Sequence, residues 1–235
     1  MINFTRAKKG LFFHLTVLGI LFAIGLFLAF TKSYTVQQEP LGQWHLNLIS
    51  KVLQPAEIDL LELDQQARQA GWEVALLLAK QGGFADDSEC GKVAGRNLWN
   101  AKDKWCLPVV KEVASNLADQ RITQNRVSFD QELLRARGEN KIINAPGEKI
   151  QRYEYSTSLA VDLAYSFDEY GQLEQEARKL INDCAGKDSE CIKSRMPRWW
   201  KLCGAEKNVF CVNSQGRYVI QDIPATYEFA LDFSG

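Results

Sequence analysis

The most uneven feature of the hydrophobic pattern is a single apolar run near the N-terminus. From Leu11 to Phe30 the chain reads LFFHLTVLGILFAIGLFLAF, twenty residues without a formal charge. At about 1.5 Å per helical residue, this run matches the roughly 30 Å hydrocarbon core of a bilayer. A cleaved secretory signal has a shorter apolar region and a small-residue cleavage site, and neither is obvious here. The pattern therefore predicts one transmembrane helix over residues 11–31, with Leu11 to Phe30 in contact with lipid.

Beyond this run the pattern is that of a folded domain with amphipathic helices. Residues 32–55 form a juxtamembrane segment, and apolar or small residues then recur alternately three and four positions apart from Ala56 to Gln81. That spacing indicates a long helix, which Gly82 and Gly83 end. Its stripe is expected to pack on its own domain, the alternative being a coiled-coil seam between chains. Two shorter helices are expected, from Pro108 to Asp119 and from Glu169 to Asp183.

Strand patterns occupy the remaining length. Apolar residues at alternate positions predict an antiparallel sheet of three or four strands, clearest from Leu159 to Phe167. The C-terminal stretch repeats the pattern, with a turn expected from Asn213 to Gly216 and a last strand from Tyr227 to Phe233. The fold class is therefore α+β, with a small antiparallel sheet and packed helices over residues 56–235.

Charge decides the expected orientation. Arg6, Lys8 and Lys9 precede the apolar run with no acid among them, which predicts a cytoplasmic N-terminus over residues 1–10. The chain has 28 Lys and Arg against 29 Asp and Glu, so 25 bases and all 29 acids lie beyond residue 31. A mildly acidic exported part is a poor candidate for nucleic-acid binding. At 235 residues, 46% hydrophobic and 24% charged, the chain is also not a collagen-like or disordered protein.

All six cysteines lie on the exported side of the apolar run, which fits an oxidising compartment. Fifteen pairings are formally open, but spacing favours the local ones, namely Cys90 with Cys106, Cys184 with Cys191, and Cys203 with Cys211. The alternative is a zinc site formed by the last four cysteines, but the gaps between these cysteines are wider than the spacing in a typical zinc knuckle. The sequence thus predicts a disulfide-stapled C-terminal region and no metal.

Catalytic motifs are missing from the sequence. His45 is the one imidazole outside the apolar run, and no phosphate loop, dinucleotide fingerprint or metalloprotease pattern occurs. The acids Asp86, Asp87 and Glu89 are expected to form a solvated loop, the alternative being a weak cation site at Asp86 and Asp87. We therefore expect a protein that is not an enzyme and needs no cofactor.

The segment RMPRWWK contains the candidate interaction patch, formed by Arg195, Arg198, Trp199 and Trp200. We expect both tryptophans to fill the core of the disulfide-stapled region. Neighbouring side chains point in different directions, however, so the alternative is that one ring is exposed and binds a glycan or a protein partner.

Five segments together resemble an uncharacterised group of single-pass membrane proteins of small-genome archaea. They are KKGLFFHLTVLGILFAIGLFLAF, DLLELDQQARQAGWEVALLLAKQGG, the loop from SEC to WC, YSFDEYGQLEQEARKLINDC and YEFALDF. The resemblance implies a domain facing the cell envelope and assigns no site residue. The single anchor, the disulfide-stapled α+β domain and the missing catalytic motifs lead us to expect a membrane-anchored, extracytoplasmic binding or scaffolding protein.

Lys8-Lys9-Gly10 directly before the apolar run resembles the processing site of archaeal type IV pilin precursors. This resemblance implies cleavage after Gly10 and an apolar helix that forms a filament core. A pilin-like subunit is therefore the alternative function, although a break at Pro40 fits a continuous stalk poorly. An envelope enzyme without a recognisable site is the second alternative.

Overall fold

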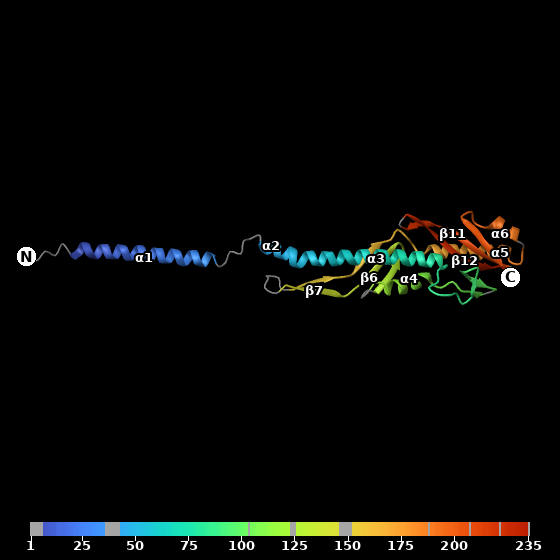
Figure 1. Cartoon of the computed structure of the whole chain (residues 1–235), viewed down its shortest axis with the longest axis horizontal. Helices are drawn as coiled ribbons and strands as arrows, with labels where there is room; N and C mark the ends of the chain where they lie inside the picture. Colours follow the sequence, from blue (N-terminus) through green and yellow to red (C-terminus); the bar gives the residue numbers. More distant parts are fainter. Residues whose placement is uncertain are drawn as a thin grey trace, which may run out of the picture. The chain divides into compact units, whose positions relative to one another are not determined.

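The computed structural model describes most of the chain, which Figure 1 shows coloured along the sequence from blue at the N-terminus to red at the C-terminus. The described residues are 7–35, 43–102, 104–122, 126–145, 152–187, 189–206, 208–220 and 222–234, without the side chains of 7–15, 31–35, 43–44 and 206. Residues 1–6 of the expected N-terminus and 36–42 of the juxtamembrane segment therefore lie outside the described residues. The expected cleavage site after Gly10 lies where the backbone alone is described. The chain divides into two compact units, Met1–Pro55 with Ile143–Tyr153, and Ala56–Ile142 with Glu154–Gly235.

The helices include the three amphipathic ones that the sequence predicts. Their bounds are α1 Ala7–Thr35, α2 Gln43–Leu48, the π-helix η1 Ile49–Leu53, α3 Gln54–Lys80, α4 Val110–Asp119, α5 Glu169–Cys184 and α6 Ser189–Arg195. The predictions for α3, α4 and α5 are confirmed to within two residues, because their apolar stripes follow the helical period.

The strands are short until the C-terminal third. They are β1 Lys92–Val93, β2 Arg96–Asn97, β3 Asn100–Ala101, β4 Lys104–Trp105, β5 Arg126–Asp130, β6 Leu133–Arg137, β7 Asn140–Asn144, β8 Arg152–Ser156, β9 Leu159–Asp162, β10 Trp200–Glu206, β11 Val209–Ile220 and β12 Ile223–Asp232. Three strands form the sheet β5-β6-β9 and three form β10-β11-β12, while β1-β2, β3-β4 and β7-β8 are two-stranded. The α+β class is confirmed, with several small sheets in place of the single middle sheet expected.

Two glycines, Gly82 and Gly83, form the C-terminal cap of α3. The Gly83 N–H donates to the Leu78 carbonyl at 2.8 Å and the Gly82 N–H to the Ala79 carbonyl at 3.3 Å, the bonding of a Schellman motif. Both glycines have positive φ, at 66° and 90°. Their backbone turn then lets the Gly82 carbonyl accept the indole N–H of Trp99 at 2.8 Å, which ties the loop after α3 into the core.

One strand is shorter than expected, and one expected turn is missing. The strand expected from Leu159 to Phe167 stops at Asp162, because the Asp162 carboxylate accepts the N–H of Ala164 at 2.8 Å and Ala164 adopts a positive φ of 50°. The turn expected from Asn213 to Gly216 is absent, since β11 continues through it and pairs with β12 on both sides of a register shift between Gln215 and Val219.

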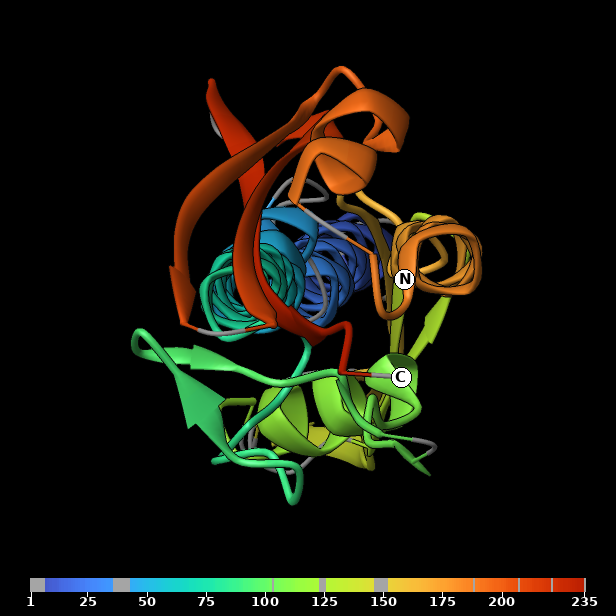
Figure 2. The same ribbon diagram turned by 90° about the vertical axis from the view of Figure 1, so that its right-hand side faces the viewer.

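The C-terminal sheet packs on the helices of the larger unit. Figure 2 shows its orange and red strands curving over α3, and Phe229 of β12 stacks on Trp99 with ring centroids 3.8 Å apart. Tyr170 of α5 meets Tyr227 of β12 edge-to-face at 5.0 Å. The first pair fixes the loop after α3 against β12, and the second fixes α5 against β12 beside the pocket described below.

The three disulfides are the local ones that the spacing favours. Cys90 is bonded to Cys106, Cys184 to Cys191 and Cys203 to Cys211. The first closes the loop containing β1 to β4, the second joins α5 to α6, and the third joins β10 to β11. The C-terminal region is therefore disulfide-stapled, as predicted.

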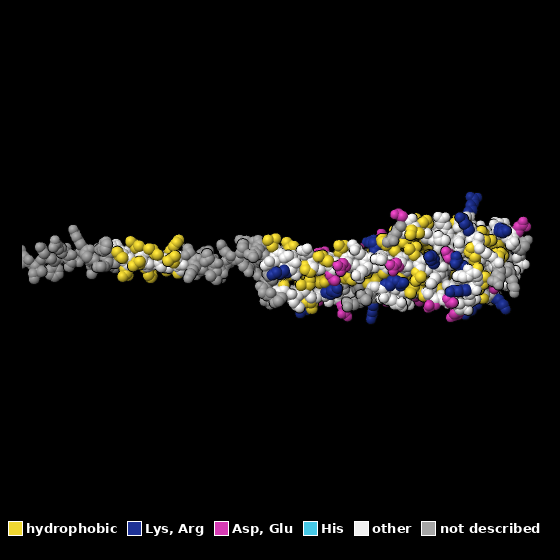
Figure 3. All heavy atoms as spheres, viewed as in Figure 1, with side chains coloured by type: hydrophobic (Ala, Val, Ile, Leu, Met, Phe, Trp, Pro, Cys, Tyr) yellow, Lys and Arg dark blue, Asp and Glu magenta, His cyan; other side chains and the backbone are white. Residues whose placement is uncertain are grey.

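The first helix carries only apolar and small side chains over residues 16–30 apart from Thr16, and all of them are exposed (Figure 3). Across the residues that the structure describes, however, no helix combines the length and the hydropathy that a membrane span requires. The helical state of this segment is confirmed, whereas the transmembrane helix expected over residues 11–31 is not.

Candidate functional site

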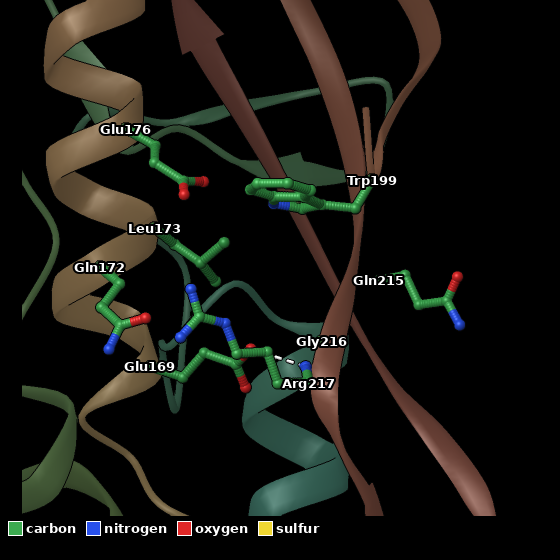
Figure 4. Close-up of a pocket in the computed structure, with 8 residues that line it drawn as sticks. All are labelled: Glu169, Gln172, Leu173, Glu176, Trp199, Gln215, Gly216 and Arg217. Carbon is green, nitrogen blue, oxygen red and sulfur yellow. Dashed lines mark hydrogen bonds between the residues drawn. The ribbon is translucent and has the colours of Figure 1, made fainter. Parts of the chain in front are cut away.

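A pocket of about 270 Å³ opens between α5 and β11 in the larger unit. Figure 4 shows its wall residues, which come from α5, from the turn before β10 and from the middle of β11. They are Glu169, Gln172, Leu173, Glu176, Trp199, Gln215, Gly216 and Arg217. The pocket therefore combines an aromatic ring, two carboxylates and a guanidinium, and we call it the Trp199 pocket.

Helical spacing places four of these residues on one face of α5. Glu169, Gln172, Leu173 and Glu176 lie three, four and seven positions apart, which are the neighbours on a helix surface. Leu173 is buried and its side chain points toward the Trp199 ring in Figure 4. The helix thus supplies an apolar base with carboxylates on either side of it.

Glu169 is a buried carboxylate whose two oxygens are both occupied. Oε1 accepts the backbone N–H of Arg217 at 2.8 Å, and Oε2 accepts the hydroxyl of Tyr227 at 2.5 Å. The register shift in β11 makes the first bond available, because it takes Arg217 out of the ladder with β12. Glu169 is therefore a structural anchor between α5, β11 and β12.

Gly216 sets how closely β11 approaches its neighbour. A Cβ there would lie 2.6 Å from the ring of Tyr227 and 3.0 Å from the carbonyl oxygen of Ala225. Since no other residue lacks a Cβ, the sharp course of β11 at the pocket depends on this glycine.

Tyr165, Tyr170 and Tyr227 form a buried cluster next to Glu169. The hydroxyls of Tyr165 and Tyr227 lie 3.1 Å apart, and Tyr170 packs against the Tyr227 ring. Burial raises the pKa of all three phenols. They stay neutral at physiological pH, so Tyr227 keeps the proton that it donates to Glu169.

Glu176 differs from Glu169 because its carboxylate is not fully bonded. Its Oε2 is shielded from solvent and has no hydrogen-bond partner among the described atoms. Burial raises the pKa of Glu176 and the Glu169 charge adds to this, while the Trp199 indole N–H and the Arg217 charge act in the opposite direction. The pocket therefore contains an acceptor whose bonding capacity is unused.

Trp199 is held in place through its backbone. Its carbonyl accepts the N–H of Gln215 at 3.1 Å, and the next residue donates its N–H to the Pro197 carbonyl at 3.0 Å, which closes a turn. Trp199 is 47% exposed, and its ring lies above Leu173 in Figure 4 with one face toward the pocket. An exposed indole at the edge of a pocket can pack against the apolar face of a ligand.

The sequence patch splits into four different environments. Trp200 is 2% exposed and meets Phe229 edge-to-face at 5.3 Å, so the expectation that both tryptophans fill the core is right for Trp200 and wrong for Trp199. Arg195 forms an ion pair with Asp183 at 3.3 Å, and Arg198 is exposed without lining the pocket. Only Trp199 of the four lines the pocket, since the turn from Pro197 to Trp200 leaves the Trp199 side chain exposed while Trp200 is buried.

Sequence reasoning missed the charged residues of the pocket. Glu169 and Glu176 have a detectable signal, since seven positions on a helix return to the same face. Arg217 has none, because it follows directly on the turn expected from Asn213 to Gly216, and nothing in the local pattern relates it to Glu169 or Glu176.

The acidic loop after α3 is engaged in ion pairs. Asp87 pairs with Lys92, and Glu89 pairs with Lys104 at 2.7 Å. Lys104 also lowers the pKa of Glu89, mainly through a hydrogen bond. In the part of the chain that the structure describes, no group of three or more His, Cys, Asp or Glu could hold a metal ion. Of the two carboxylates of the alternative cation site, that of Asp87 therefore already has Lys92 as its cationic partner.

Comparison with known proteins assigns no function. No protein-family model, curated protein or solved structure matches the chain. The function must therefore be argued from the Trp199 pocket and from the sequence.

Proposed function

We propose that this protein is a membrane-anchored, extracytoplasmic binding protein that holds a small polar ligand in the Trp199 pocket. The observation that carries the proposal is the pairing of a half-exposed indole with a shielded, unpartnered carboxylate oxygen in one hollow. Binding sites are typically concave and mostly apolar, with a few well-placed polar groups.

The chemistry of the pocket favours binding over catalysis. Hydrolysis by paired carboxylates needs two groups that are free to act as acid and as base or nucleophile. Glu169 already accepts from Arg217 and Tyr227, so Glu176 is the one carboxylate of the pocket with an unused oxygen. A single available carboxylate suits ligand recognition.

The membrane anchor is supported by the apolar run from Leu11 to Phe30. The side chains of α1 over residues 16–30 are all exposed, and apart from one threonine they are apolar or small. Such a surface is poorly suited to water and well suited to lipid. The basic residues before it favour an N-terminus in the cytoplasm. Three disulfides in the remaining chain support an oxidising, extracytoplasmic environment.

Protease accessibility tests the topology. A protease added to intact cells should digest a C-terminal tag and leave an N-terminal tag untouched. The reverse result would refute the orientation, and recovery of the tagged chain from the soluble fraction would refute the anchor.

N-terminal sequencing of the mature protein tests the alternative. A start at Leu11 would favour the pilin-like subunit over the anchored binding protein, since cleavage after Gly10 releases the apolar helix for filament assembly. An intact N-terminus supports the proposal.

A further inference from the structure

Beyond binding in general, we propose that the ligand of the Trp199 pocket is a neutral sugar ring, such as one terminal pyranose of an envelope glycan. This inference rests on the proposed binding function and names its ligand class. Three properties of the pocket lead to it: its size, its combination of an aromatic face with both donors and acceptors, and its balance of charge.

Size limits the ligand to about one ring. The pocket volume of about 270 Å³ lies just under the range of about 300–1,000 Å³ that drug-sized ligands occupy. A single six-membered ring fits such a space, and further units would have to extend into solvent.

The indole of Trp199 offers the surface that the apolar side of a pyranose requires. The ring is half exposed, and Figure 4 shows Leu173 between it and the guanidinium of Arg217. A sugar carries C–H groups on one side and hydroxyls around its rim. Its C–H side would cover the indole while the rim faces the polar residues.

The polar residues supply both kinds of hydrogen bond that a hydroxyl makes. Glu176 accepts, Arg217 donates, and the amide of Gln172 does both. Oε2 of Glu176 lacks a donor, and the terminal torsion of a glutamate is soft enough for the carboxylate to turn toward a ligand hydroxyl. A sugar hydroxyl would satisfy this oxygen and accept from Arg217 with its own lone pairs.

The charges disfavour ionic ligands of either sign. An ammonium group would approach Arg217, whose charge is close enough to influence Glu176. A carboxylate or phosphate would approach Glu169 and Glu176, and burial already raises the pKa of the latter. A neutral polyol avoids both penalties.

Saturation-transfer NMR and calorimetry on the full chain test the inference. The protein is kept in a polyoxyethylene detergent, because a glycoside detergent would itself present sugar rings. The probes are glucose, galactose, mannose and N-acetylglucosamine, with tetramethylammonium and acetate as ionic comparators. We expect at least one neutral sugar to bind with a Kd of about 1 mM, as weak single-ring ligands do, and neither ion to bind.

Pocket variants locate the binding. Trp199→Ala should weaken it at least tenfold, Trp199→Phe should keep part of it, and Glu176→Gln should weaken it about three- to tenfold. Arg198→Ala is the matched control, since Arg198 is exposed next to Trp199 but does not line the pocket. A thermal melt of each variant checks that the fold is intact.

The outcomes separate the two proposals. Binding of tetramethylammonium or acetate without any sugar, lost in Trp199→Ala, would overturn the sugar assignment and retain the binding function. Sugar binding that survives Trp199→Ala unchanged would overturn the assignment to this pocket. Failure of every probe to bind the folded chain would overturn both the sugar inference and the role of the pocket.

Discussion

Replacing each of the two adjacent tryptophans by alanine should have very different effects on stability. Trp200 is 2% exposed and packs edge-to-face on Phe229 at 5.3 Å, whereas Trp199 is 47% exposed. Removing a buried tryptophan costs about 3–5 kcal/mol, through lost transfer energy and the cavity left behind. Removing the half-exposed ring should cost about 1 kcal/mol or less, because most surface substitutions fall near zero.

The difference is large enough for a thermal melt followed by circular dichroism. In a domain of 150–250 residues, about 1 kcal/mol shifts the Tm by roughly 2–4 °C. Trp200→Ala should therefore lower the Tm by about 6–20 °C, and Trp199→Ala by about 4 °C or less. Urea unfolding at one temperature should give the same order of free energies of unfolding.

Trp200→Phe is a control for the chemistry of the buried site. The indole Nε1 of Trp200 has no hydrogen-bond partner among the described atoms, and a buried unpaired donor costs about 1–3 kcal/mol. Phenylalanine removes that donor and keeps most of the ring, so we expect a loss below about 2 kcal/mol. Equal losses in Trp199→Ala and Trp200→Ala would refute the reasoning, because both rings would then belong to the core.

Three further measurements check other parts of the structure. Tyr227→Phe removes the donor to Oε2 of Glu169 and should lower the free energy of unfolding by about 1–3 kcal/mol, measured in urea; an unchanged value would contradict the buried bond. Because burial raises the pKa of Glu176 above its ordinary 4.5, this group favours the folded state at low pH and loses that contribution as the pH rises through its folded-state pKa. Glu176→Gln should therefore reduce the fall in Tm above pH 4.5, and an identical pH profile would argue against the shift. Replacing Cys90 and Cys106 together by serine should cost about 2–4 kcal/mol, and non-reducing peptide mapping of the native chain should recover the two in one linked fragment.

Local patterns in the sequence were enough for several features. The period of 3.6 predicts α3, α4 and α5, and Gly82 and Gly83 end α3 because their positive φ suits a helix C-terminus. The three disulfides follow from spacing, since cysteines close in the chain meet with little loss of loop entropy. These features depend on residues near one another in sequence.

The course of β11 could not be read in this way. Asn213 to Gly216 has the composition of a turn, yet these residues continue the strand because β12 pairs with β11 on both sides of the register shift. Long-range pairing with a neighbouring strand overrides local turn preference. The continued strand carries Gln215, Gly216 and Arg217 along the pocket wall.

The sequence by itself determined the amphipathic helices α3, α4 and α5, the local disulfides and the α+β class, and it is the source of the proposed membrane anchor. Only the tertiary structure decided which tryptophan is buried and which carboxylate is left with an unused oxygen. Glu169, Trp199 and Arg217 come together across α5, a turn and β11, and nothing local in the chain relates them. The physical reason is that burial and hydrogen-bond satisfaction depend on what packs against a residue from distant segments, whereas helical period and turn chemistry depend on its neighbours in sequence.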